Sequence, residues 1–159
     1  MTNNTKDTPQ IVVGIGASAG GLAALRHLLP NLPVGRGFTY VLIQHMDPTH
    51  PSTLDQILSR DTALSVEQAV NDTRLCSDHL YITPSDKNSV VVDGTLLLED
   101  VRDIGPRHSI DVLLSSIAAA HGDAAVGIIL SGTGSDGLQG AHTLKAAHGL
   151  VLAQDPHRC

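Results

Sequence analysis

Three residues of this sequence have the side chains of a hydrolytic triad, and each lies at or shortly after the end of an apolar run. They are Ser18, His45 and Asp136, and the runs cover 10–15, 38–45 and 125–130. A serine hydroxyl becomes a useful nucleophile when a histidine accepts its proton, and a buried aspartate then fixes the tautomer of that histidine. If the runs are parallel strands, their carboxyl ends lie at one edge of a sheet. The sequence therefore predicts a Ser-His-Asp site at that edge.

Ser18 lies in the glycine-rich stretch 16–21, which has the sequence GASAGG. This stretch contains the G-x-S-x-G pattern of a turn that presents a nucleophilic serine between a strand and a helix. Hydrolysis of an ester also needs N–H donors for the negative charge that develops on the carbonyl oxygen. We expect these donors at Ala19 and Gly20, because a helix is predicted to begin there and small residues let a substrate approach the backbone.

The same turn also fits a second function, dinucleotide binding. Residues 14–19, GIGASA, satisfy the G-x-G-x-x-G/A pattern that holds a pyrophosphate. Such a site needs an acidic residue about 20 positions further on, at the tip of the second strand, to bind the ribose. That tip carries Gln44 and His45, and Asp47 comes only after the strand should have ended. The sequence favours the nucleophilic serine and leaves a dinucleotide-binding module as the weaker alternative.

His45 and Asp136 each have an alternative role without catalysis. His45, Asp47 and His50 are spaced like metal ligands. No cysteine, second carboxylate or helical H-E-x-x-H spacing accompanies them, so we expect no metal site. Asp136 precedes a predicted helix and fits the N-cap of that helix. Asp111, at the start of another predicted helix, is expected to be a cap or a surface charge.

Short apolar runs alternate with segments of helical periodicity along most of the chain, which predicts an α/β fold. We expect a doubly wound, three-layer α/β/α, Rossmann-like domain with a mainly parallel sheet. An antiparallel hairpin is expected at 89–99, because Asp93-Gly94 favours a type I′ turn. The predicted strands cover 10–15, 38–45, 63–69, 79–83, 125–130 and 150–153, and the predicted helices cover 19–29, 52–59, 109–120 and 138–148.

The composition restricts the partners of such a domain. The 159 residues carry a net charge of -6 and their basic residues are scattered, which disfavours nucleic acid and an anionic membrane surface. No apolar run approaches the length of a membrane span, so we expect no membrane insertion. Cys76 and Cys159 form no C-x-x-C pair and have no zinc spacing, which favours the reducing cytoplasm. Residues 1–9 are polar and lack the apolar segment of a signal peptide. We therefore expect a disordered tail at 1–9 and one domain at 10–159.

Six short motifs occur in order along the chain: GASAGG (16–21), QHM (44–46), PSDK (84–87), HSIDVLL (108–114), LSGTGSDG (130–137) and AQD (153–155). Together they resemble the chemotaxis-type protein-glutamate methylesterases, the CheB catalytic domain family. The resemblance implies that Ser18, His45 and Asp136 form the triad of a serine hydrolase without a cofactor. It implies γ-glutamyl methyl esters on methyl-accepting chemotaxis receptors or similar sensory proteins as substrates, with deamidation of receptor glutamines in some relatives.

The sequence departs from the family pattern at several points. Thr133 replaces a methionine in the loop before Asp136, and its backbone is a further candidate contact for the substrate oxygen. No receiver domain precedes the first predicted strand, which resembles fused proteins with methylesterase, methyltransferase and sensor domains. The chain stops at Cys159, before a strand and helix that the family adds, so we expect an open strand edge there. A catalytically inactive domain that only docks receptors is the main alternative function.

Overall fold

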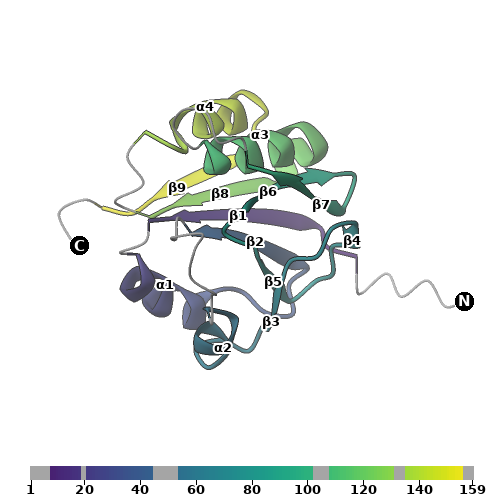
Figure 1. Cartoon of the computed structure of the whole chain (residues 1–159). Helices are drawn as coiled ribbons and strands as arrows, with labels where there is room; N and C mark the ends of the chain where they lie inside the picture. The colour runs from purple at the N-terminus through teal and green to yellow at the C-terminus, as the bar shows by residue number, and fades with distance from the viewer. Residues whose placement is uncertain (1–7, 19–20, 45–53, 102–107, 131–134, 156–159) are drawn as a thin grey trace, which may run out of the picture.

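The computed structural model describes residues 8–18, 21–44, 54–101, 108–130 and 135–155 (Figure 1). Within them, helices cover both faces of a central sheet: α3 and α4 lie on one face, and α1 and α2 lie on the other. The helices are α1 (Leu22–Leu28), α2 (Leu54–Ser59), α3 (Ser109–His121) and α4 (Leu138–Ala146). This arrangement confirms the expected three-layer α/β/α fold.

The central sheet has six strands in the order β3-β5-β2-β1-β8-β9, and every pairing in it is parallel. The chain adds strands on one side of β1 and then returns to add β8 and β9 on the other side. This reversal makes the carboxyl end of β1 the topological switch point, where open α/β sheets bind ligands. The strands are β1 (Ile11–Ala17), β2 (Phe38–Gln44), β3 (Ser65–Gln68), β5 (His79–Ile82), β8 (Ala125–Ile129) and β9 (Leu150–Ala153).

The predicted hairpin is present and belongs to a separate three-stranded antiparallel sheet. Asp93 and Gly94 have φ values of 46° and 78°, as a type I′ turn requires. Ser116 Oγ of α3 accepts a hydrogen bond of 2.9 Å from the Val91 N–H, so the small sheet braces that helix. The strands of this sheet are β4 (Thr73–Arg74), β6 (Lys87–Val92) and β7 (Thr95–Asp100), of which the two-residue β4 was not expected.

Helices α3 and α4 lie close to the sheet because glycines face them. A Cβ added at Gly16 would lie 2.7 Å from Ile110 Cδ1, and one added at Gly127 would lie 2.6 Å from Leu144 Cδ1. These distances are too short for ordinary contacts, so only glycine allows the side chains of the two helices to sit against the strand backbone at these points. The close packing brings the first turn of α3 to the carboxyl end of the sheet.

Two helix boundaries differ from the predictions. Helix α1 begins at Leu22 and not at Ala19. Helix α4 ends at Ala146, and His148, with φ 67°, takes the left-handed position that was expected of Gly149. The amide of Gly149 still closes the helix end by donating to Leu144 O at 2.8 Å.

Strand β9 forms one edge of the sheet in the part of the chain that the structure describes. Its side chains Leu150 and Leu152 are 56% and 48% exposed, as expected for an open apolar edge. Among the described helices, none has both the length and the hydropathy needed to span a membrane.

Candidate active site

Three neighbouring strands lead to the three predicted triad positions. Strand β1 lies between β2 and β8, and Ala17 at the end of β1 pairs with Gln44 at the end of β2. Ser18 is the first residue after β1, and Asp136 lies in the segment that joins β8 to α4. His45 follows Gln44 directly in sequence, but it lies outside the described residues. The fold thus delivers Ser18 and Asp136 to the carboxyl edge of the sheet, at the switch point.

The backbone around Ser18 is held by hydrogen bonds to both sides of the turn. Ser18 O accepts from the Gly21 N–H at 2.9 Å and from Gln44 Nε2 at 3.2 Å. Helix α1 begins at Leu22, so the predicted helix start at Ala19 is wrong. A Cβ at Gly21 would lie 3.1 Å from Ser18 O, so this turn needs a glycine there.

The predicted oxyanion donors lie outside the described part of the chain. These residues are Ala19, Gly20 and Thr133, and their role stays a prediction. The same holds for the alternative metal site at His45, Asp47 and His50.

Asp136 is buried, and its carboxylate binds the first turn of α3 rather than the helix that follows it. Oδ2 accepts from the Ile110 N–H at 3.1 Å, and Oδ1 accepts from the Asp111 N–H at 2.9 Å. The first amides of a helix have no partner within the helix, and its dipole favours a negative charge there. Asp136 is therefore a helix cap, as the sequence allowed, but it caps a helix 25 residues earlier in the chain.

Asp111, in the first turn of α3, in turn caps α4. Its Oδ1 accepts from the Gly137 N–H at 2.9 Å and from the Gly140 N–H at 2.8 Å. The sequence does not indicate this exchange, because a capping residue normally lies next to its own helix. Both aspartates lie in recognised motifs, HSIDVLL and LSGTGSDG, but nothing local indicates that each binds the helix of the other.

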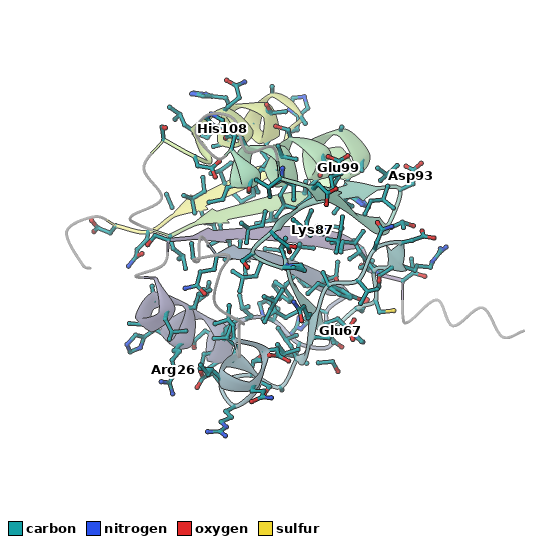
Figure 2. The ribbon with its side chains drawn as sticks, viewed as in Figure 1. Arg26, Glu67, Lys87, Asp93, Glu99 and His108 are labelled. Carbon is teal, nitrogen blue, oxygen red and sulfur yellow. The ribbon has the colours of Figure 1, made fainter. Side chains whose placement is uncertain are left out.

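A group of three potential metal ligands lies at the same place. His108, Asp111 and Asp136 have ligand atoms within 4.8 Å of one another, and His108 Nδ1 is 3.3 Å from Asp111 Oδ2. His108 is exposed in the layer of α3 and α4 (Figure 2). Three of the four carboxylate oxygens of the aspartates accept backbone N–H bonds, and the fourth faces His108. We attribute the cluster to helix capping.

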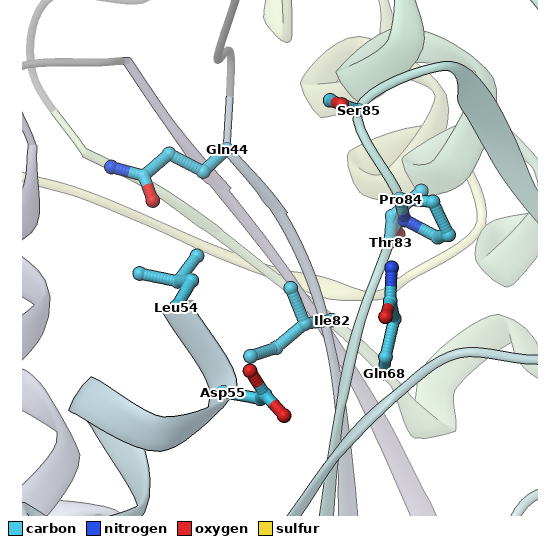
Figure 3. Close-up of a pocket in the computed structure, with 8 residues that line it drawn as sticks. All are labelled: Gln44, Leu54, Asp55, Gln68, Ile82, Thr83, Pro84 and Ser85. Carbon is cyan, nitrogen blue, oxygen red and sulfur yellow. The ribbon is translucent and has the colours of Figure 1, made fainter. Parts of the chain in front are cut away.

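A small pocket opens beside the ends of β2, β3 and β5 (Figure 3). Gln44 and Leu54 line one side of it, and Gln68 and Thr83 line the other. The Gln44 Nε2 donates to Ser18 O, whereas its Oε1 is buried and has no hydrogen-bond partner among the residues that the structure describes. Gln44 directly precedes the predicted histidine, His45, in the sequence.

Two buried tyrosines have raised pKa values, and both are structural. Burial, with a smaller contribution from the charge of Asp78, raises the pKa of Tyr40 to about 12. Burial also raises the pKa of Tyr81 strongly. Tyr40 OH donates to Pro33 O at 2.8 Å, and Tyr81 OH accepts from the Cys76 N–H at 2.9 Å. Phenols that stay protonated and bonded to backbone fix the strands and offer no base for catalysis.

The fold is a parallel α/β domain that carries Ser18 at its topological switch point. Comparison with known proteins narrows the class. The chain belongs to the CheB methylesterase family, whose model matches residues 13–159.

Curated relatives and a solved structure agree with this family. A "Protein-glutamate methylesterase/protein-glutamine glutaminase" of Photorhabdus laumondii is 35% identical over 93% of this chain, and one of Chromobacterium violaceum is 35% identical over 96%. The chain spans only 43% and 44% of the length of these relatives. The crystal structure of the Thermotoga maritima CheB methylesterase catalytic domain superposes with a TM-score of 0.84 at 29% identity, covering 96% of this chain and 83% of that one.

Proposed function

We propose that this chain is a methylesterase domain that hydrolyses γ-glutamyl methyl esters on methyl-accepting chemotaxis receptors or related sensory proteins. The proposal depends mainly on one observation: Ser18 and Asp136 follow the adjacent strands β1 and β8, at the carboxyl edge of the central sheet. Membership of the methylesterase family supports the substrate class. The names of the relatives include glutaminase, so we propose deamidation of receptor glutamines as a second activity.

The proposed reaction proceeds in two steps. Ser18 Oγ attacks the ester carbonyl carbon while His45 accepts the serine proton, and the tetrahedral intermediate then expels methanol, which takes that proton from His45. A water molecule attacks the acyl-serine while His45 accepts a proton from it. His45 returns the proton to Ser18 Oγ, and the glutamate is released. With a glutamine substrate the leaving group is ammonia instead of methanol.

Asp136 has the proposed role of stabilising the imidazolium that forms twice in this cycle. Two backbone N–H groups of α3 fix the rotation of the Asp136 carboxylate. This supports the proposed role, because a carboxylate that is already held in place need not reorient during the reaction. The backbone N–H groups of Ala19, Gly20 and Thr133 are our candidates for the oxyanion donors.

The partners and setting of the domain are part of the proposal. Receptor cytoplasmic segments are the proposed protein substrates, and methyltransferase or sensor domains of the same protein are proposed further partners. We place the reaction in the cytoplasm, in keeping with two cysteines that lack disulfide spacing.

The decisive experiment measures methanol release from methylated receptor cytoplasmic domains. Ser18→Ala should lower turnover by at least about a thousandfold, because the nucleophile is gone while alanine fits the small-residue turn. Ser59→Ala, at an exposed serine of α2, is the control and should match the unmodified chain. Excess chelator should have no effect. Receptor binding without methanol release would instead identify a docking domain, and tight dinucleotide binding would favour the other alternative.

A further inference from the structure

We propose that Asp111 is a positioning residue that holds Asp136 in its working orientation. The basis is the pair of reciprocal caps, defined here as the bonds from Ile110 and Asp111 N–H to Asp136 and from Gly137 and Gly140 N–H to Asp111. The inference rests on the proposed function, because Asp136 is a catalytic residue only if the chain is a hydrolase.

Neither helix has a cap of its own. The N-cap residue of α3 is His108 and that of α4 is Gly137, and neither makes a side-chain cap hydrogen bond. Asp136 binds the second and third amides of α3, where an N-cap side chain would normally bind. Asp111 binds the amide of the N-cap residue and the third amide of α4, so one carboxylate makes both bonds of a capping box.

Asp111 contacts Asp136 from both sides. Its own N–H donates to Asp136 Oδ1, and its Oδ1 accepts from the Gly137 N–H, which belongs to the peptide bond directly after Asp136. The two residues thus close a ring in which the first bond restricts the carboxylate and the second restricts the backbone that carries it. Loss of the bond from the Gly137 N–H to Asp111 Oδ1 would let the backbone next to Asp136 move, although the Asp136 side chain itself is not altered.

Helices α3 and α4 pack closely against each other at the reciprocal caps. A Cβ at Gly140 would lie 2.7 Å from Leu114 Cβ and 3.2 Å from the Asp111 Cα, so the helices touch where the caps form. Gly137 has φ 105°, a conformation that favours glycine and turns its amide toward Asp111. The short aspartate side chain spans the remaining gap.

The proposed role of Asp111 depends on its acceptor oxygen more than on its charge. His108 Nδ1, 3.3 Å away, faces the other oxygen, Oδ2, which makes no cap bond. An asparagine at this position keeps an acceptor for the amides of Gly137 and Gly140. An alanine leaves both amides without a partner.

The kinetic test compares Asp111→Ala, Asp111→Asn and the control Asp123→Ala, which changes an exposed aspartate in the first turn of the 3-10 helix after α3. Asp111→Ala should lower kcat about a hundredfold with little change in KM, because displacement of a catalytic group slows chemistry more than binding. Asp111→Asn should lose less than Asp111→Ala, and Asp123→Ala should match the unmodified chain.

The pH profile separates positioning from loss of folded protein. A displaced Asp136 stabilises the imidazolium less, so the acidic limb of the kcat/KM profile of Asp111→Ala should move to lower pH. A variant that is only less stable loses amplitude without this shift. An unshifted limb would therefore overturn the proposal.

Amide hydrogen exchange supplies a measurement that does not depend on activity. In Asp111→Ala, exchange should accelerate at Gly137 and Gly140, and also at Ile110, whose amide donates to Asp136 Oδ2. Acceleration that spares Ile110 would overturn the proposal. If Asp111→Ala does not fold, Asp111→Asn carries the same test, because its weaker acceptor should accelerate exchange at Gly137 and Ile110 together.

If the proposed function is wrong, the results differ from those expected if only the role of Asp111 is wrong. Without the proposed function, the unmodified chain would neither release methanol nor be labelled at Ser18 by a fluorophosphonate probe. The exchange rates would still decide whether Asp111 holds Asp136.

Discussion

The two faces of the central sheet pack their helices by different means. On the α3–α4 face, glycines remove side chains from the strands, so that a Cβ at Gly14 would lie 2.8 Å from Leu114 Cδ2. On the α1–α2 face, large side chains such as Leu25, Leu29 and Leu58 fill the space and are at most 1% exposed. Figure 1 shows the two layers above and below the sheet.

This difference matters for the candidate site. The α3–α4 face holds its helices by close backbone approach and by the reciprocal caps, which fix the position of Asp136 within narrow limits. The α1–α2 face depends on apolar volume, which stabilises the fold but tolerates small shifts. Its surface ion pair between Arg26 and Asp61, at 3.0 Å with Arg26 55% exposed, adds little.

The largest expected effect of breaking the α3–α4 face is that of Asp136→Asn. We expect kcat to fall about ten-thousandfold, because the asparagine cannot fix the tautomer of the histidine or stabilise its charge. Stability should also fall, by about 1–3 kcal/mol, because an amide side chain offers one acceptor where Ile110 and Asp111 donate two N–H groups to two oxygens. Steady-state kinetics and urea unfolding measure the two effects.

Leu25→Ala is the matched change on the α1–α2 face. It should lower stability by about 2–5 kcal/mol through the cavity it leaves, while the kcat of the folded fraction stays near that of the unmodified chain. If Leu25→Ala lowers kcat per folded molecule as strongly as Asp136→Asn, it is wrong that the α3–α4 face positions the catalytic residue while the α1–α2 face only stabilises the fold.

A smaller effect is expected when a methyl group is added on the α3–α4 face by Gly16→Ala. The new Cβ would lie 2.7 Å from both Cδ1 and Cγ2 of Ile110, so α3 must move outward at a cost of about 1–3 kcal/mol. Because the amide of Ile110 binds Asp136, kcat should fall as well.

A double-mutant cycle with Ile110→Ala tests that cause. Removal of the Ile110 side chain removes the clash, so Gly16→Ala should cost little stability in that background. Additive losses in urea unfolding would show that the clash is not the reason.

The smallest expected effect lies at the far end of α3, at His121. Burial lowers the pKa of this histidine, partly offset by the charge of Asp93, and its Nε2 is buried with no hydrogen-bond partner in the described part of the chain. The unfolded chain, with a histidine pKa near about 6.5, then binds the proton more readily than the folded one. Stability should therefore be unaffected above that pH and should decrease as the pH falls below it.

Thermal unfolding at several pH values checks this sign. His121→Gln should remove the part of the acid slope that His121 contributes. His27→Gln, at an exposed histidine of α1, is the control from the other face and should follow the unmodified chain. A slope that survives His121→Gln unchanged would assign the acid sensitivity to other groups.

Features set by short-range physics were predictable from the sequence. The hairpin follows from Asp93-Gly94, because few residues accept positive φ at both turn positions. The parallel strands follow from continuous apolar runs, since β1 and β2 are buried on both faces. The start of α1 at Leu22 was missed because spacing and helix propensity do not fix the first residue of a helix.

The sequence by itself determined the α/β class, the order of most elements and the choice of Ser18, His45 and Asp136 as the chemically interesting residues. Each of these depends on residue type and on spacing along the chain. Only the tertiary structure decided that Asp136 caps α3 and that Asp111 caps α4. The reason is physical: helix amides bind whichever carboxylate lies within reach, and the close packing of α3 against α4 sets that neighbour across a sequence separation of at least 25 positions.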